Sequence, residues 1–231
     1  MTGPRWTAVG FDLDGTLVDS RPGIEWAARE AALVAAPGHD LVGFADHIGA
    51  RVPALFERCL PQAGPEVVVE VGRAFRRLYD DEGWRRCTVY PGVVDLLDAL
   101  VAAGTTCHVV TNKPSTPTAA ILALHGLDRW VSSAVSPDSP PTHPDKDAAL
   151  AWLVGQRAWV PAEVLFVGDT VEDLEAATHS GTSFIGAAYG YGGAGLRQVP
   201  GALLCGDSTQ LAALVFGEAS PTGADTANLS G

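Results

Sequence analysis

The chain has 231 residues, which is enough for one large domain or two small ones. Apolar residues make up 47% and charged residues 18%, so the composition predicts a buried core and excludes a disordered chain. The formal net charge of −12 repels phosphate backbones and anionic lipid, which argues against binding to nucleic acid or to a membrane surface.

Three further features of the sequence bear on where the protein is located. No run of about 18 apolar residues occurs, so no transmembrane helix is predicted. The four cysteines form no C-x-x-C pair and are too few for a secreted disulfide scaffold. An acidic motif at residues 12–14 stands where a secretory signal would need apolar residues. We therefore expect a reduced, cytoplasmic globular protein.

Short apolar runs recur along the chain, and several are separated by stretches with helical periodicity. The runs are residues 7–11, 106–110, 130–135, 164–167, 183–185 and 202–204, and the helical stretches are 93–103, 117–125, 147–154 and 171–179. Strands of continuous apolarity that are separated by helices indicate a parallel sheet covered on both faces. The sequence therefore predicts an α/β fold with a Rossmann-like sheet, in which ligands bind at the carboxyl ends of the strands.

The interval between the first two strands is far longer than one crossover helix requires. Most of it has helical periodicity, in residues 24–36, 41–45, 52–60 and 66–84. We interpret this interval as an inserted α-helical cap domain, residues 18–88, in a core formed by residues 1–17 and 89–216. The remaining residues, 217–231, lack apolar periodicity and are predicted to be a disordered tail.

The first strand runs directly into two carboxylates, Asp12 and Asp14. Residues two apart in extended chain face the same way, so both carboxylates emerge together at the carboxyl end of the strand. Two negative charges this close are unfavourable unless a cation or a shared proton offsets them. The alternative is a pair of solvated turn aspartates before Gly15.

The strand at 164–167 also ends in carboxylates, Asp169 and Asp173. If this strand is parallel to the first and next to it, these groups lie beside Asp12 and Asp14. Four carboxylates without a nearby histidine or thiol form a hard oxygen site of the kind that suits Mg²⁺. The alternatives are that Asp169 caps a helix and that Asp173 is a favourable charge in a helical first turn.

Two further segments carry residues that could bind phosphate. Thr111 ends the strand at 106–110, and its hydroxyl and the backbone N–H groups of the following loop could hold phosphate oxygens. Lys146 lies at the start of a predicted helix, where a cation opposes the helix dipole and requires a carboxylate or a bound anion nearby. The alternatives are an ordinary turn threonine and a surface lysine screened by Asp145 and Asp147.

The segments FDLDGTLVDS, VTNKP, the Lys146 region and VGDTVEDLEAA resemble the four ordered motifs of the haloacid dehalogenase-like hydrolase superfamily. The resemblance covers nearly all of residues 6–216, and the insertion lies where relatives with a helical cap carry theirs. The VTNKP segment and the GYG stretch at 190–192 are most similar to phosphoglycolate phosphatases and their close relatives.

The resemblance implies a Mg²⁺-dependent phosphatase that acts on a small phosphorylated metabolite through an aspartyl-phosphate. Asp12 would be the nucleophile, and Asp14 would protonate the leaving group and then deprotonate water. The other implied roles are phosphate binding by Thr111, Asn112 and Lys146, and metal binding by Asp12, the backbone carbonyl of Asp14, Asp169 and Asp173. In the insertion, Arg51 is a candidate to bind the anionic group at the remote end of the substrate. The alternative is that Arg51 is a solvated arginine at the start of a helix.

Several alternatives remain open at this point. Relatives often continue the third motif with Pro-x-Pro, whereas here Lys146 is followed by Asp-Ala-Ala. Another residue could therefore bind the phosphate, although Lys113 is the only other lysine in the chain. Asp14 argues against a carbon–halogen hydrolase, and residues 18–88 contain no lysine for carbon–phosphorus chemistry. Nucleoside monophosphates, sugar phosphates and pyrophosphate are alternative substrates, and a phosphoryl-accepting signalling or binding domain is the non-enzymatic alternative. The oligomeric state is left open.

Overall fold

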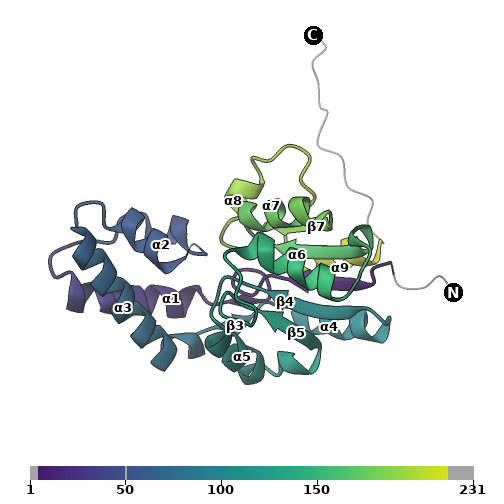
Figure 1. The fold of residues 1–231 in the computed structure, drawn as a ribbon, viewed down its shortest axis with the longest axis horizontal. Coiled ribbons are helices and arrows are strands. Elements are labelled where there is room, and N and C mark those ends of the chain that lie inside the picture. Colours follow the sequence, from purple (N-terminus) through teal and green to yellow (C-terminus); the bar gives the residue numbers. More distant parts are fainter. Residues whose placement is uncertain (1–4, 50, 218–231) are drawn as a thin grey trace, which may run out of the picture.

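The computed structural model describes residues 5–49 and 51–217, which form two units that lie side by side (Figure 1). One unit is a parallel sheet with helices on both faces, and the other is a group of helices to one side of it. The α/β class predicted from the sequence is confirmed. The predicted disordered tail, 217–231, lies outside the described residues except for Gly217, which ends the last helix.

Within the described residues the sheet has six strands in the order β5-β4-β1-β6-β7-β8, and all neighbouring pairs are parallel. The strands are β1 (Ala8–Phe11), β4 (Thr106–Val110), β5 (Val131–Val135), β6 (Val164–Gly168), β7 (Ser183–Ala187) and β8 (Leu204–Cys205). Each lies where the sequence predicts a strand. Along the chain, β4 and β5 are added on one side of β1, and β6, β7 and β8 are then added on the other side. The direction of strand order therefore changes at β1, and the crevice at its carboxyl end is the expected ligand site.

The helices around the sheet mostly follow the predicted periodicity. They are α4 (Val93–Ala102), α5 (Ser115–Leu124), α6 (Lys146–Gln156), α7 (Val171–Ser180), α8 (Gly193–Leu196) and α9 (Ser208–Phe216), with 3₁₀ turns η3 (Leu127–Arg129) and η4 (Pro161–Glu163). The first four were predicted, whereas α8 and α9 were not. The signals for α9 are Asp207, whose side chain accepts a hydrogen bond from the Gln210 N–H, and Gly217 in the left-handed conformation at its end.

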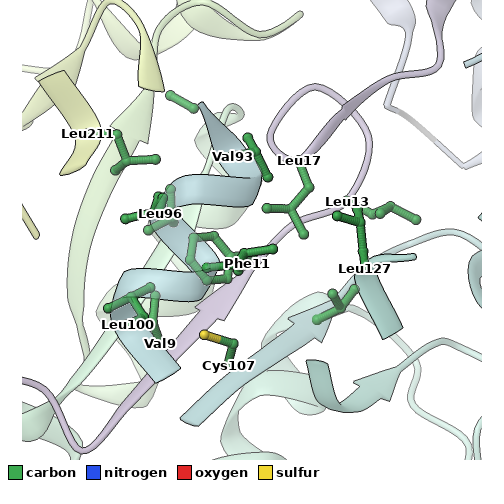
Figure 2. Packing of buried hydrophobic residues seen from close by; sticks show 14 of the residues in the cluster. Val9, Phe11, Leu13, Leu17, Val93, Leu96, Leu100, Cys107, Leu127 and Leu211 are labelled. Carbon is green, nitrogen blue, oxygen red and sulfur yellow. The ribbon is translucent and has the colours of Figure 1, made fainter. Parts of the chain in front are cut away.

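The sheet is covered on both faces, as the continuous apolarity of its strands predicts. Val9 and Phe11 of β1 pack in a buried cluster with residues of α4, α9 and β4, shown in Figure 2. Ala8 belongs to a second cluster on the opposite face, with Leu150 of α6 and Phe166 of β6. Because successive strand residues point to opposite faces, a strand without polar residues is buried on both.

The helices beside the sheet have a hydrophobic core of their own. They are α1 (Arg21–Ala35), α2 (Val52–Cys59) and α3 (Pro65–Asp81), with 3₁₀ turns η1 (Phe44–His47) and η2 (Gly83–Arg85). We call this group the helical module. Its core brings together small residues of α1, such as Ala27 and Ala31, with Phe56 of α2 and with Val71 and Phe75 of α3.

Two predicted helices of this module differ from the structure. The prediction over residues 41–45 is wrong, because Gly43 is left-handed (φ 61°) and the Val42 N–H donates to the Cys59 carbonyl at 2.9 Å. These features hold the segment against the end of α2, and the only helical turn nearby within the described residues is η1. The single helix predicted over 66–84 ends at Asp81, and the chain turns at Gly83, where its backbone packs against Gly23 of α1.

Two very short strands connect the helical module to the sheet. Strands β2 (Val18–Asp19) and β3 (Thr88–Val89) pair antiparallel, and the Tyr90 N–H donates to the Leu17 carbonyl at 3.1 Å. We call β2 and β3 the connecting ribbon, which lies between the two units in Figure 1. The sequence did not predict it, because two-residue strands are too short to show a hydrophobic period.

The described residues contain neither a membrane-spanning helix nor a disulfide. In residues 5–49 and 51–217, no helix combines the length and apolarity needed to cross a bilayer. The four cysteines are buried thiols. Burial raises the pKa of Cys107 and of Cys205 to about 12, so both are expected to behave as small hydrophobic residues.

Candidate active site

The adjacency of β1 and β6 brings two acidic strand ends together. Phe11 pairs with Val167 in the sheet, and the Asp12 N–H donates to the Val167 carbonyl at 2.8 Å. Asp12 therefore follows β1 at the same edge of the sheet at which Asp169 follows β6. The sequence predicted this juxtaposition on the condition that the two strands are neighbours, and the strand order meets that condition.

Three carboxylates meet at this edge. Asp12, Asp169 and Asp173 each offer an oxygen, and these oxygens all lie within 4.8 Å of one another. All three residues are buried, with exposed fractions of 4%, 0% and 0%. Asp173 comes from the first turn of α7, where its side chain and that of Thr170 cap each other's backbone N–H groups. The helix start thus orients the third carboxylate.

Backbone groups hold the carboxylate of Asp169 from one side only. Its Oδ2 accepts hydrogen bonds from the N–H groups of Tyr191 at 2.6 Å and Gly192 at 3.0 Å. Its Oδ1 is buried and has no hydrogen-bond partner among the described residues. A buried oxygen without a donor is unfavourable unless a cation or water completes it, so this atom is a candidate metal ligand.

Lys146 lies within the carboxylate cluster rather than on the surface. Its Nζ donates to Asp12 Oδ1 at 2.9 Å and to Asp173 Oδ1 at 2.5 Å, and the residue is only 4% exposed. Burial alone would lower the pKa of Lys146, but the attraction of Asp12 and Asp173 raises it above its ordinary value. Lys146 is therefore a fixed positive charge in the cluster.

The charge balance of this cluster favours a divalent cation. Burial raises the pKa of Asp12, and Asp173 and Asp169 raise it further against the opposing effect of Lys146. Burial and the charge of Asp173 also raise the pKa of Asp169. Three buried carboxylates and one lysine leave excess negative charge, which a bound divalent cation would neutralise. The all-oxygen donor set and the unpartnered Oδ1 of Asp169 fit a hard cation.

Asp14 lies outside this three-carboxylate group. Its Oδ2 pairs with Lys113 Nζ at 2.9 Å, and its Oδ1 accepts a hydrogen bond from the Ser20 hydroxyl. Lys113 is buried and also donates to the Tyr79 hydroxyl of α3 at 2.8 Å. The sequence left Lys113 open as the only other lysine that could bind the phosphate, and its contact with Asp14 was not predicted.

The two predicted phosphate ligands after β4 have different surroundings. Thr111 is buried, and its hydroxyl oxygen accepts a hydrogen bond from the Lys113 N–H at 3.2 Å. The Asn112 side-chain amide donates to both carboxylate oxygens of Glu172 in α7, at 3.1 and 3.0 Å. Asn112 Oδ1 is buried, and no group in residues 5–49 and 51–217 forms a hydrogen bond with it. Both residues nevertheless line the same cavity as Asp12 and Lys146.

This cavity, of about 150 Å³, lies between the strand ends and the helical module. The sheet unit contributes Asp12, Asp14, Thr111, Asn112, Lys113, Lys146 and Thr170, and the module contributes Arg51, Phe75, Arg76, Tyr79 and Asp80 among others. Arg51 is exposed and lines this cavity, a position that is compatible with both roles that the sequence left open for it. Arg76 is a second module arginine that the sequence analysis did not single out, because nothing in the helical pattern of α3 distinguishes it from its neighbours.

Known proteins match this chain over most of its length. A family model described as haloacid dehalogenase-like hydrolase matches residues 6–181. A phosphoglycolate phosphatase of Vibrio vulnificus strain YJ016 is 36% identical over 199 residues, which cover 83% of this chain and 87% of the relative. One of Haemophilus influenzae strain 86-028NP is 33% identical over 81% of this chain and 88% of its own length.

Solved structures show the same architecture. The structure of a predicted phosphoglycolate phosphatase from Haemophilus somnus 129PT superposes with a TM-score of 0.78 at 28% identity, and covers 93% of this chain and 99% of its own. A haloacid dehalogenase-like family protein from Streptococcus pneumoniae gives a TM-score of 0.82 at 21% identity, with 91% and 98% coverage. At that identity the second match supports the fold alone.

The fold is a parallel sheet covered by helices, and the described residues bring three buried carboxylates together at the edge of that sheet. The chain belongs to the haloacid dehalogenase-like hydrolase family, and within it the chain is a phosphatase. The resemblance drawn from the sequence motifs and the prediction of a phosphatase are both confirmed. The signalling and binding-domain alternatives are thereby set aside.

Proposed function

We propose that this phosphatase hydrolyses phosphoglycolate or a phosphomonoester of the same small, doubly anionic kind, with Mg²⁺ as its metal. The observation that carries the proposal is the buried group of Asp12, Asp169, Asp173 and Lys146, of which Asp12 and Lys146 line a cavity that also has two module arginines, Arg51 and Arg76, in its wall. The names of the relatives at 33–36% identity support the same substrate. The cavity is smaller than the roughly 300–1,000 Å³ typical of sites for drug-sized ligands, which favours a small metabolite.

In this proposal Asp12 is the nucleophile. Its carboxylate oxygen attacks the phosphorus and displaces the substrate oxygen, which forms an aspartyl-phosphate on the protein. Asp14 gives its proton to the departing oxygen and then takes a proton from the water that hydrolyses the aspartyl-phosphate.

The remaining polar groups hold the phosphate and the metal. Lys146, Thr111 and Asn112 would bind phosphate oxygens, and Asn112 would exchange its contact with Glu172 for one with the substrate. The metal ligands would be Asp12, the backbone carbonyl of Asp14, Asp169 and Asp173, as the family pattern implies. When bound, Mg²⁺ would neutralise charge on the phosphoryl oxygens, so that a carboxylate could approach them.

We further propose that the helical module is a cap domain, residues 18–88, that closes over a core of residues 1–17 and 89–216. Its separate hydrophobic core and its connection through one short ribbon support this division. On closure, Arg51 and Arg76 would face the remote anion of the substrate and exclude bulk water. The four buried thiols support the proposal that the enzyme works in a reducing compartment such as the cytoplasm.

The nucleophile is tested with Asp12→Asn. The variant should lose turnover of phosphoglycolate and of p-nitrophenyl phosphate by a factor of about 10³ or more, because an amide cannot attack the phosphorus. EDTA should abolish wild-type turnover, and added Mg²⁺ should restore it. The matched control is Asp128→Asn, at an exposed position in η3, which should keep wild-type rates. An Asp12→Asn enzyme that folds and retains most of its rate would contradict the assignment.

Substrate choice is tested separately with cap arginines. Arg51→Ala and Arg76→Ala should each raise KM for phosphoglycolate about tenfold, because a charge-assisted hydrogen bond is lost, and leave p-nitrophenyl phosphate nearly unchanged. Arg73→Ala is the matched control, since Arg73 is exposed on α3 and pairs with Glu70. Equal losses on both substrates would argue against a remote-anion role. A panel with nucleoside monophosphates, sugar phosphates and pyrophosphate would then identify the preferred substrate.

A further inference from the structure

Tyr191 contacts two parts of the molecule at once. Its backbone N–H donates to Asp169 Oδ2 at 2.6 Å, at the carboxylate cluster. Its side-chain oxygen accepts hydrogen bonds from the backbone N–H groups of Ser20 at 2.6 Å and Arg21 at 2.9 Å, and donates to Asp19 Oδ1 at 2.9 Å. Asp19 ends one strand of the connecting ribbon and Arg21 begins α1. One residue thus joins the base of the helical module to the acidic site.

The ring of Tyr191 also belongs to the helical module by packing. It lies against the module's hydrophobic core, whose other members in the described residues all fall between residues 24 and 84. The guanidinium of Arg21 lies over the ring, 4.9 Å from its centroid. A movement of the module about the connecting ribbon therefore has to displace Tyr191 or break these contacts.

The backbone on both sides of Tyr191 packs very closely against Asp169. A Cβ on Gly190 would lie 2.4 Å from Asp169 Cβ, and a Cβ on Gly192 would lie 2.5 Å from the Asp169 carbonyl oxygen. The glycines on both sides of Tyr191 thus allow the backbone to approach Asp169 closely. Because the contact is this tight, a shift of Tyr191 is transmitted to the carboxylate.

A second contact joins residues 19–21 to the site. The hydroxyl of Ser20, whose N–H bonds to Tyr191, donates to Asp14 Oδ1. The segment from Asp19 to Arg21 therefore touches both the proposed acid and base, Asp14, and the residue that holds Asp169. This segment is where the chain passes from the sheet unit into α1.

We propose that Tyr191 is a positioning residue that couples the orientation of the helical module to the metal-binding oxygen of Asp169. This inference rests on the proposed function, since it takes Asp169 as a metal ligand. If Asp169 holds a metal ion, its carboxylate would be fixed in place, and the hydrogen bonds of Tyr191 would then hold the connecting ribbon as well. By thermodynamic reciprocity, a module position that favours these hydrogen bonds also favours metal binding.

The test uses Tyr191→Phe, which keeps the ring, its packing and the backbone N–H and removes only the oxygen that contacts residues 19–21. The matched control is Tyr189→Phe, which removes a hydroxyl two residues earlier that donates to the Thr16 carbonyl at 2.9 Å. Hydrogen exchange of the peptide covering residues 17–24 is measured with and without MgCl₂. The readout is the change caused by Mg²⁺, which a merely structural role of the hydroxyl would not alter.

Mg²⁺ should slow exchange of this peptide about fivefold or more in the wild type and in Tyr189→Phe, and should have almost no effect in Tyr191→Phe. A Mg²⁺ effect of the same size in Tyr191→Phe would overturn the coupling. Calorimetric titration of Asp169→Asn with MgCl₂ separates the two proposals. Loss of binding in that variant, together with an unchanged response in Tyr191→Phe, refutes the coupling alone. Wild-type binding in Asp169→Asn would overturn both the metal assignment and the coupling.

Discussion

Gly190 has no room for a side chain, so its replacement by alanine tests how closely the chain packs around Asp169. An alanine Cβ would lie 2.3 Å from the Gly15 carbonyl oxygen, 2.4 Å from Asp169 Cβ and 2.6 Å from Asp169 Oδ2. Ordinary contacts at such a position begin at 3.4 Å. The added methyl group therefore overlaps its neighbours by about 1 Å, and two of these three atoms cannot rotate away.

The expected loss of stability follows from this overlap. Overpacking of a well-packed site costs about 1–3 kcal/mol, and the upper end applies here because backbone has to move. In a protein of this size each kcal/mol corresponds to about 2–4 °C, so Gly190→Ala should lower Tm by about 6–12 °C. Displacement of the Asp169 carboxylate should also weaken Mg²⁺ binding by about 10–100-fold, the usual effect of disturbing groups that orient a metal ligand.

The assays are thermal and urea denaturation for stability and calorimetric titration with MgCl₂ for metal binding. Gly155→Ala is the matched control, because Gly155 lies in α6 and a Cβ there would meet no atom within 4 Å. Alanine is the better helix former, so this control should gain about 0.5 kcal/mol and keep its Mg²⁺ affinity. If Gly190→Ala is as stable as the wild type and binds Mg²⁺ as tightly, the close packing around Asp169 described above is wrong.

Three further predictions concern single contacts. Burial lowers the pKa of His108 from 6.5 to about 4, so the folded ring stays neutral while the unfolded ring gains a proton. Stability should therefore fall by at most about 3 kcal/mol as pH drops from 6.5 to 4, and His108→Gln should flatten this slope in urea denaturation. Thr170→Ala should lower the free energy of unfolding by about 1 kcal/mol and weaken Mg²⁺ binding, because Asp173 loses its partner in the capping box. Thr170→Ser keeps the hydroxyl and should behave as the wild type. Equal behaviour of the two variants would contradict the capping role. Lys113→Met and Tyr79→Phe should each destabilise the protein. Because the two residues share one buried hydrogen bond, the stability lost in the double variant should be smaller than the sum of the two single losses by at least about 0.5 kcal/mol. Additive losses would refute the coupling.

The pattern of neighbouring residues was sufficient to predict the strands and the helix that carry the carboxylates. The apolar runs that became β1 and β6 are short and continuous, and each ends at an acidic residue, so strand, sheet type and strand end are all visible in the sequence. The capping box at Thr170 and Asp173 and the left-handed glycine at 181 likewise mark the ends of α7. These signals depend on neighbouring residues alone, which is why the sequence predicts them well.

Local pattern failed where a conformation depends on contacts with distant residues. The segment 41–45 has helical composition, but its hydrogen bond to Cys59 and the left-handed Gly43 keep it irregular. The strands of the connecting ribbon are two residues long and pair across almost the whole helical module. Neither feature has a periodic signature, because each is stabilised by a partner far away in the sequence.

The amino-acid order by itself thus determined the class of fold, the position of the inserted helices and the identity of the acidic and basic groups at the strand ends. Only the tertiary structure decided which of these groups meet. It set β1 between β4 and β6, placed Lys146 between Asp12 and Asp173, and gave Asp14 the partner Lys113. These pairings follow from strand order and side-chain packing, which depend on the whole chain and which no short stretch of sequence encodes.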